Sequence, residues 1–123
     1  MSEFKKIGLE ENLVLAVEKM GFETPSEVQS KTIPILLEKD TDLVALAQTG
    51  TGKTAAFGLP MIQKIDVNSK TTQGLILSPT RELCLQITNE IKQYGQFYKG
   101  LNVTAIYGGC LLYTSDAADD LFR

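Results

Sequence analysis

The sequence predicts an α/β fold, in which a parallel sheet is flanked by helices. Short apolar runs alternate along the chain with segments whose apolar residues recur every three or four positions. Such alternation is typical of strands that are connected by helices. In addition, a glycine-rich turn, AQTGTGKT at residues 47–54, joins one apolar run to a helical segment. Because strands connected through helices run parallel, we expect both faces of the sheet to be covered.

The first forty residues are predicted to form two helices. Apolar residues between Leu9 and Met20 recur at helical spacing, and Gly21 is a suitable residue to end that helix. The segment TPSEVQSKTIPILLEKD predicts a second helix, capped by Ser26 or Thr24 and bent at Pro34. Its expected inner face consists of Val28, Thr32, Ile35 and Leu36.

Three short apolar runs predict the strands of the sheet. They are Leu43–Ala47, which leads into the glycine-rich turn, Gly74–Leu77 (GLIL) and the β-branched Val103–Tyr107 (VTAIY). A helix is expected to open with Lys53 to Phe57, directly after the turn. Another is expected in RELCLQITNEIKQYGQFY, where the residues repeating at helical spacing are Leu83, Ile87, Ile91 and Tyr94.

Composition sets limits on the class of protein. The chain has 123 residues, of which 43% are hydrophobic and 22% charged, as expected for one globular domain. Its net charge of -3 would not attract a polyanion to the whole molecule, so any nucleic-acid binding must be local. Two cysteines and no histidine exclude the usual zinc sites and make a disulfide framework unexpected. The N-terminus has no apolar run suited to a signal peptide or membrane span, so the predicted location is the cytoplasm.

The glycine-rich turn has the pattern of a phosphate-binding loop. It matches G-x4-G-K-[ST], with Ala47 in place of the first glycine. Glycines let backbone N–H groups approach phosphate oxygens, Lys53 would reach the β and γ phosphates, and Thr54 would offer its hydroxyl to Mg²⁺. The alternative is a glycine-rich turn with an incidental lysine. The predicted phosphate-binding residues, of which Lys53 and Thr54 are also the predicted catalytic pair, are Gln48, Thr49, Gly50, Thr51, Gly52, Lys53 and Thr54.

Five motifs in order resemble the DEAD-box family of ATP-dependent RNA helicases. They are Phe4, GFETPSEVQ at 21–29, AQTGTGKT at 47–54, SPTRELCLQ at 78–86 and YGG at 107–109. The resemblance implies an incomplete RecA-like P-loop domain, with ATP and Mg²⁺ as cofactors and RNA as the partner. It divides the chain into a Q-motif helical region at 1–40 and the N-terminal part of the RecA-like ATP-binding helicase domain 1 at 41–109.

The resemblance also indicates which residues would contact the adenine base of ATP. Gln29 carries an acceptor and a donor side by side, which complement adenine's N6 donor and N7 acceptor and would select ATP over GTP. By resemblance, Phe4 stacks on the adenine ring. Without a nucleotide, Gln29 would be an ordinary solvated helix residue and Phe4 a local core anchor.

The resemblance further assigns contacts with the RNA backbone. SPTRE has the form of a helix start, in which Ser78 caps and Pro79 takes the first helical position. In the family this stretch touches RNA phosphates, a role that falls here on Pro79, Thr80 and Arg81 and that carries no sequence preference. The glycines of YGG suit close approach of backbone to phosphate, although the tripeptide alone is weak evidence. Those glycines are Gly108 and Gly109.

Several parts needed for turnover are missing from this sequence. The family's metal-binding DEAD carboxylates, its Ser-Ala-Thr motif and the arginine finger of a second domain do not occur in the 123 residues. We therefore expect a fragment that is inactive and poorly soluble by itself. Two alternatives stay open, a fragment of another P-loop ATPase (a DNA helicase or translocase) and a non-catalytic nucleotide-binding fragment.

The last residues depart from the family pattern. CLLYTSDAAD at 110–119 resembles the translation of a transposase adapter used in sequencing libraries. The segment 110–123 is therefore predicted to be a non-native tail, and its acidic pair Asp119 and Asp120 is not expected to replace the missing carboxylates.

Overall fold

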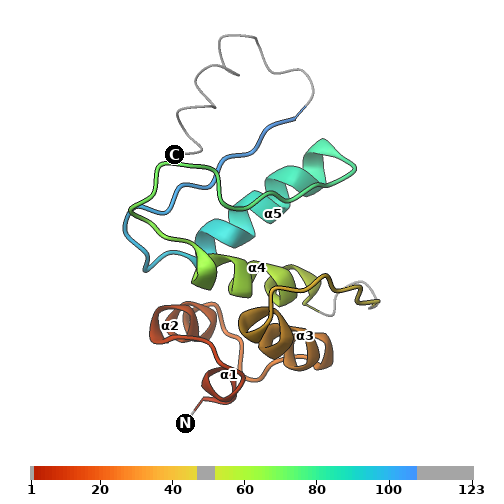
Figure 1. The fold of residues 1–123 in the computed structure, drawn as a ribbon, viewed down its shortest axis with the longest axis vertical. Helices are drawn as coiled ribbons and strands as arrows, with labels where there is room; N and C mark the ends of the chain where they lie inside the picture. The colour runs from red at the N-terminus through yellow and green to blue at the C-terminus, as the bar shows by residue number, and fades with distance from the viewer. Residues whose placement is uncertain (1, 47–51, 108–123) are drawn as a thin grey trace.

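The computed structural model describes residues 2–46 and 52–107. Within these residues it has five helices, and α4 lies between α1–α3 on one side and α5 on the other (Figure 1). Their bounds are α1 Glu3–Lys6, α2 Glu11–Lys19, α3 Glu27–Glu38, α4 Lys53–Lys64 and α5 Arg81–Tyr94. The rest of the predicted turn at 47–51, the glycines 108 and 109 and the tail 110–123 lie outside the described residues.

The two predicted N-terminal helices are confirmed. Helix α2 ends just before Gly21, whose φ of 92° is in the left-handed region that favours glycine. Helix α3 begins with a capping box, in which the Ser26 hydroxyl accepts from the Gln29 N–H and the Gln29 Oε1 accepts from the Ser26 N–H. Pro34 lies inside α3, as predicted.

The predicted inner face of α3 is partly wrong. Thr32 is buried, but the other buried residues are Gln29 and Ile33, whereas Ile35 is 37% exposed. The reason is that α3 packs through residues four positions apart, Gln29 and Ile33.

One apolar core joins the helices. Its buried side chains come from α1, α2 and their connecting loop, from α3 and α4, and from the second half of α5. Burying each such large side chain stabilises the fold by about 1.5 to 3 kcal/mol. Those fully buried are Phe4, Leu13, Val17, Ile33, Leu59 and Ile62.

The predicted strands do not appear as strands in residues 2–46 and 52–107. The segments 43–46, 74–77 and 103–107 carry no strand assignment, and residues 41–46 are all exposed. The segments 74–78 and 101–106 instead border, with α4 and α5, a cavity of about 420 Å³ whose lining is largely apolar. A strand is defined by backbone pairing with a neighbour, and these apolar runs lack such pairing here.

The start of α5 differs by two residues from the expectation. The N-cap is Thr80, whose hydroxyl accepts from the Leu83 N–H at 3.2 Å, and Arg81 is the first helical residue. Ser78 is therefore not the cap and Pro79 is not the first helical residue. Either hydroxyl could have capped, and the structure uses the one closest to the apolar repeat.

In the part of the chain that the structure describes, no helix is both long and apolar enough to cross a membrane.

Candidate nucleotide and RNA site

The start of α4 presents the described part of the predicted phosphate site. Gly52 is its N-cap, with a φ of 81° that a side chain would strain, and no side chain caps the helix there. Lys53 is exposed and Thr54 is half-buried on the first turn. A helix start of this kind offers its first N–H groups and the positive end of its dipole to an anion.

Gln29 joins the predicted Q motif to this helix start. Its Nε2 donates to the Gly52 carbonyl at 3.2 Å, and the residue is 4% exposed. A Cβ on residue 52 would lie 2.2 Å from that Nε2, so only glycine fits at this contact. The same amide thus caps α3 and holds the residue from which α4 starts.

Adenine pairing by Gln29 stays a prediction, and the hydrogen bonds of its side chain define which donor and which lone pair would serve for it. An amide side chain has two N–H donors and two lone pairs on its oxygen. One donor is taken by Gly52 and one lone pair by the Ser26 N–H. Counting partners among residues 2–46 and 52–107, one donor and one lone pair are left, which is the pair that adenine's edge requires.

Phe4 lies in the core, with 0% of its surface exposed. In this conformation it acts as a packing residue among α1–α3, as the alternative interpretation of the sequence described. Stacking on adenine would require the ring to gain an exposed face, and it stays a prediction.

The predicted RNA-contacting residues lie at an exposed corner. Pro79, Thr80 and Arg81 are all exposed at the start of α5. The Arg81 guanidinium carbon lies 4.9 Å from the centroid of the Tyr107 ring, a cation–π contact. This contact brings the predicted motif at 78–86 next to the residue that opens YGG.

Tyr107 contacts a predicted RNA-binding residue, although the sequence alone predicts no role for it. Its signal was its place in YGG, but the contact with Arg81 spans 26 positions and could not be read from spacing. The contact holds the Arg81 guanidinium over the Tyr107 ring, and phosphate binding by Arg81 stays a prediction. The Thr80 hydroxyl accepts from the Leu83 N–H and still has a proton to donate.

The described residues contain no group of three His, Cys, Asp or Glu side chains that could hold a metal ion. Cys84 is a free, half-buried thiol whose Sγ lies 3.9 Å from the Ile106 carbonyl oxygen.

Comparison with known proteins decides the family. The family model of DEAD/DEAH box helicases matches residues 26–118. The chain belongs to this family. The match includes the turn at 47–54 and continues past residue 109 into part of the predicted non-native tail, whose origin stays a prediction.

Curated relatives from bacteria agree with this family. The chain is 51% identical over 109 residues to the ATP-dependent RNA helicase CshA of Listeria monocytogenes, covering 89% of this chain and 21% of that protein. It is 47% identical over 106 residues to the ATP-dependent RNA helicase DeaD of Mycobacterium tuberculosis, covering 86% and 19%. The chain thus spans about a fifth of the length of these relatives.

Solved structures show the same relationship. A DEAD box protein from Methanococcus jannaschii matches with a TM-score of 0.82 and 34% identity, over 98% of this chain and 33% of that one. Dbp5 of S. cerevisiae, solved with RNA and ADP BeF3, matches with a TM-score of 0.78 and 28% identity, over 91% and 30%. The arrangement of the helices is therefore that of a DEAD-box protein, although the structure shows no sheet in its described residues.

Proposed function

We propose that this chain is the N-terminal part of a DEAD-box ATP-dependent RNA helicase, which binds ATP with Mg²⁺ at residues 48–54 and the RNA backbone at residues 79–81 and 108–109. The observation that carries the proposal is the hydrogen bond from Gln29 to the Gly52 carbonyl. It puts the amide predicted to recognise adenine against the first turn of the helix predicted to hold phosphates. The relatives named as ATP-dependent RNA helicases, and Dbp5 with its bound RNA and ADP BeF3, support it.

The residues at the start of α4 would divide the work of binding. ATP supplies a phosphoanhydride whose cleavage is the driving reaction, and Mg²⁺ neutralises its charge. Lys53 would add a positive charge beside the terminal phosphates, and the uncapped N–H groups of α4 would point at phosphate oxygens. Thr54 would orient the metal through its hydroxyl, and Gln29 would favour adenine through its remaining donor and lone pair.

Residues 79–81 at the start of α5 would bind the RNA backbone without sequence specificity. Arg81 and Thr80 offer a charged fork and a hydroxyl, both suited to phosphate oxygens. Their exposure leaves room for a strand, and Tyr107 fixes one side of the Arg81 guanidinium.

Hydrolysis needs more than these residues supply. A general base or water-positioning residue, metal-binding carboxylates and an arginine finger are required for phosphoryl transfer. Since the 123 residues contain none of the family's motifs for these roles, we propose that the chain by itself binds but does not turn over ATP.

The test is phosphate release by the full-length protein that carries this segment, with and without RNA. We expect release to be stimulated by single-stranded RNA, not by DNA of the same sequence, and to fall at least a hundredfold in Lys53→Ala. The matched control is Lys64→Ala, at the other end of the same helix, which should leave the rate unchanged. Stimulation by DNA alone would favour another class of P-loop ATPase, and sustained release by the 123-residue chain would contradict its predicted inactivity.

A further inference from the structure

A second glutamine attaches the N-terminal helices to α4, at the end opposite to Gln29. Gln63 lies in the last turn of α4, half-buried, and its side chain reaches the loop between α1 and α2. Its Oε1 accepts from the Glu10 N–H at 2.9 Å, and its Nε2 donates to the Gly8 carbonyl at 3.0 Å.

These two hydrogen bonds pair with the backbone of the loop between α1 and α2, as the backbone of a neighbouring strand would. They satisfy the backbone groups on either side of Leu9, whose side chain is 2% exposed in the core. A further hydrogen bond orders the loop, since the Gly8 N–H donates to the Lys5 carbonyl at 3.1 Å, and the φ of 107° at this position favours glycine. The hydroxyl of Tyr98 donates to the Glu10 carboxylate and so contacts the same loop.

Helix α4 is therefore fastened at both ends to the unit formed by α1, α2 and α3. Gln29 contacts the Gly52 end, and Gln63 lies near the other end, about 17 Å away at 1.5 Å per residue. Core packing through Leu59 and Ile62 holds α4 against the other helices, and the two glutamines add a hydrogen-bonded point near each end of the helix. With the Gln29 and Gln63 contacts both in place, the distance between the predicted adenine-binding residues and the predicted phosphate-binding residues is fixed.

We propose that Gln63 is a positioning residue for the nucleotide site: by fixing the Gly8–Glu10 loop to α4, it keeps Phe4 and Gln29 in register with Lys53 and Thr54. This inference rests on the proposed function. Gln63 touches no nucleotide itself. Its effect is to limit the orientations of α4, and hence to raise the fraction of molecules that are ready to bind ATP.

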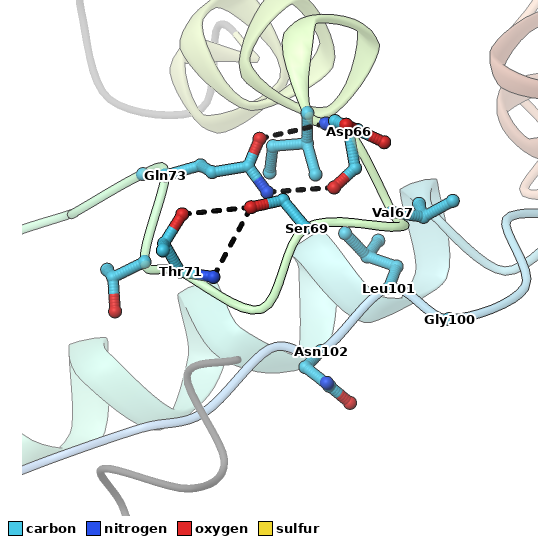
Figure 2. Close-up of a pocket in the computed structure, with 11 residues that line it drawn as sticks. Asp66, Val67, Ser69, Thr71, Gln73, Gly100, Leu101 and Asn102 are labelled. Carbon is cyan, nitrogen blue, oxygen red and sulfur yellow. Dashed lines mark hydrogen bonds between the residues drawn. The ribbon is translucent and has the colours of Figure 1, made fainter.

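The chain contains a matched control in Gln73. The Gln73 side chain makes the same two kinds of bond to a loop: its Oε1 accepts from the Asp66 N–H at 2.8 Å and its Nε2 donates to the Asp66 carbonyl at 2.9 Å (Figure 2). It closes only the loop between α4 and α5, beside a small cavity of about 60 Å³. Gln73 therefore supplies equal hydrogen bonding with no link to the N-terminal helices.

The experiment compares Gln63→Met with Gln73→Met in the full-length protein. Methionine keeps the length of the side chain and removes both hydrogen bonds. Steady-state phosphate release is measured against ATP concentration, at saturating RNA, and the dissociation constants of ATP and GTP are measured at equilibrium. We expect Gln63→Met to raise KM for ATP three- to tenfold, while kcat stays within twofold of the wild-type value. The dissociation constant of GTP divided by that of ATP should be smaller than in the wild-type protein.

Gln73→Met should leave KM and the nucleotide ratio unchanged. A purely structural role for Gln63 would lower the melting temperature of Gln63→Met and leave its KM unchanged, which would overturn the proposal. If Gln63→Met does not fold, Gln63→Glu retains the acceptor for the Glu10 N–H and should show a smaller rise in KM; no rise in that variant would equally overturn it. A wild-type protein that binds no ATP would refute the proposed function, whereas normal ATP binding with no effect at Gln63 would refute only this inference.

Discussion

The helical unit built from α1–α4 and the extended segments that follow the helices differ sharply in how they bury apolar residues. In the helical unit, Leu13, Ile33 and Leu59 have no exposed surface. In the extended segments, Leu46 is 95% and Leu77 is 85% exposed. Both regions contain large apolar side chains, so the presence of apolar residues alone does not explain the difference.

The difference lies in where the backbone finds its hydrogen bonds. A helix satisfies its own N–H and carbonyl groups within four residues, so it forms wherever one apolar stripe finds a partner. A strand needs a neighbouring strand, and a strand of a parallel sheet needs cover on both faces. Residues 74–77 show half of that cover, since Ile76 packs against the core while Leu75 and Leu77 are exposed.

The largest expected effect contrasts the two regions directly. Leu59→Ala should lower the free energy of unfolding of the 123-residue chain by about 2 to 5 kcal/mol, because it leaves a cavity in the core. Leu77→Ala should change it by less than about 0.5 kcal/mol, because its side chain is already in water. Urea denaturation measures both, and equal losses would show that the two regions do not differ in packing.

A polar residue at position 77 should have opposite effects in the 123-residue chain and in the full-length protein. In the 123-residue chain, Leu77→Ser should reduce aggregation and the binding of a hydrophobic dye, because it removes exposed apolar surface. In the full-length helicase of the proposed function, the same substitution should cost about 2 to 3 kcal/mol, because the completed sheet would bury Leu77. Light scattering and thermal unfolding of the two proteins supply the comparison; a loss of stability in both would contradict it.

Gly52 tests whether the helical unit controls the nucleotide site. Gly52→Ala should weaken ATP binding by the full-length protein at least tenfold, because its Cβ would clash with the Gln29 amide as well as strain a backbone at a φ of 81°. Gly21→Ala is the control, since its φ is 92° but nothing lies within 4 Å of its Cβ. Both variants carry a strain of about 1 to 2 kcal/mol, so backbone strain alone does not separate them. Calorimetric titration with ATP should show the loss in Gly52→Ala alone.

The smallest predicted effect concerns pH and the loop held by Gln63. Burial and the Glu90 charge raise the pKa of Tyr94 to about 12, and burial, the hydrogen bond to Glu10 and its charge raise the pKa of Tyr98 further. Both pKa values exceed the tyrosine pKa of about 10 in the unfolded chain, so the two protonated hydroxyls stabilise the folded protein. This contribution is complete below pH 10 and is lost as the pH rises through the pKa values of the folded protein.

Tyr98→Phe should therefore cost about 1 kcal/mol at neutral pH, through its hydrogen bond, and flatten the decline in stability above pH 10. Urea unfolding at several pH values between 7 and 11 measures this. A variant whose alkaline decline matches that of the wild-type protein would exclude Tyr98 as a source of the effect.

Local signals explain what the sequence predicted correctly. The Ser26 and Gln29 pair is three residues apart, the spacing of a capping box, and Gly21 marks the end of α2. The short α1 was missed because four residues are too few to show a helical period. The N-cap of α5 was misplaced because Ser78 and Thr80 both suit a cap and Pro79 lies between them.

Contacts between distant residues could not be predicted in the same way. The bonds of Gln63 to Gly8 and Glu10 cross 55 and 53 positions, and nothing in its helix distinguishes it from an ordinary polar residue. The internal partners of Gln29 were missed for the same reason: the sequence suggested a side chain facing a purine, whereas half of its hydrogen-bonding capacity is used by Ser26 and Gly52.

The most direct test of the central claim, that Gln29 couples adenine recognition to the start of α4, is the relative affinity for ATP and GTP of the full-length protein and its Gln29→Glu variant. Glutamate retains the acceptor of the capping box and removes the donor to Gly52. We predict that the wild-type protein binds ATP at least tenfold more tightly than GTP, as a bidentate base contact of about 1 to 3 kcal/mol allows, and that the variant loses this preference. An unchanged preference in the variant would contradict the account.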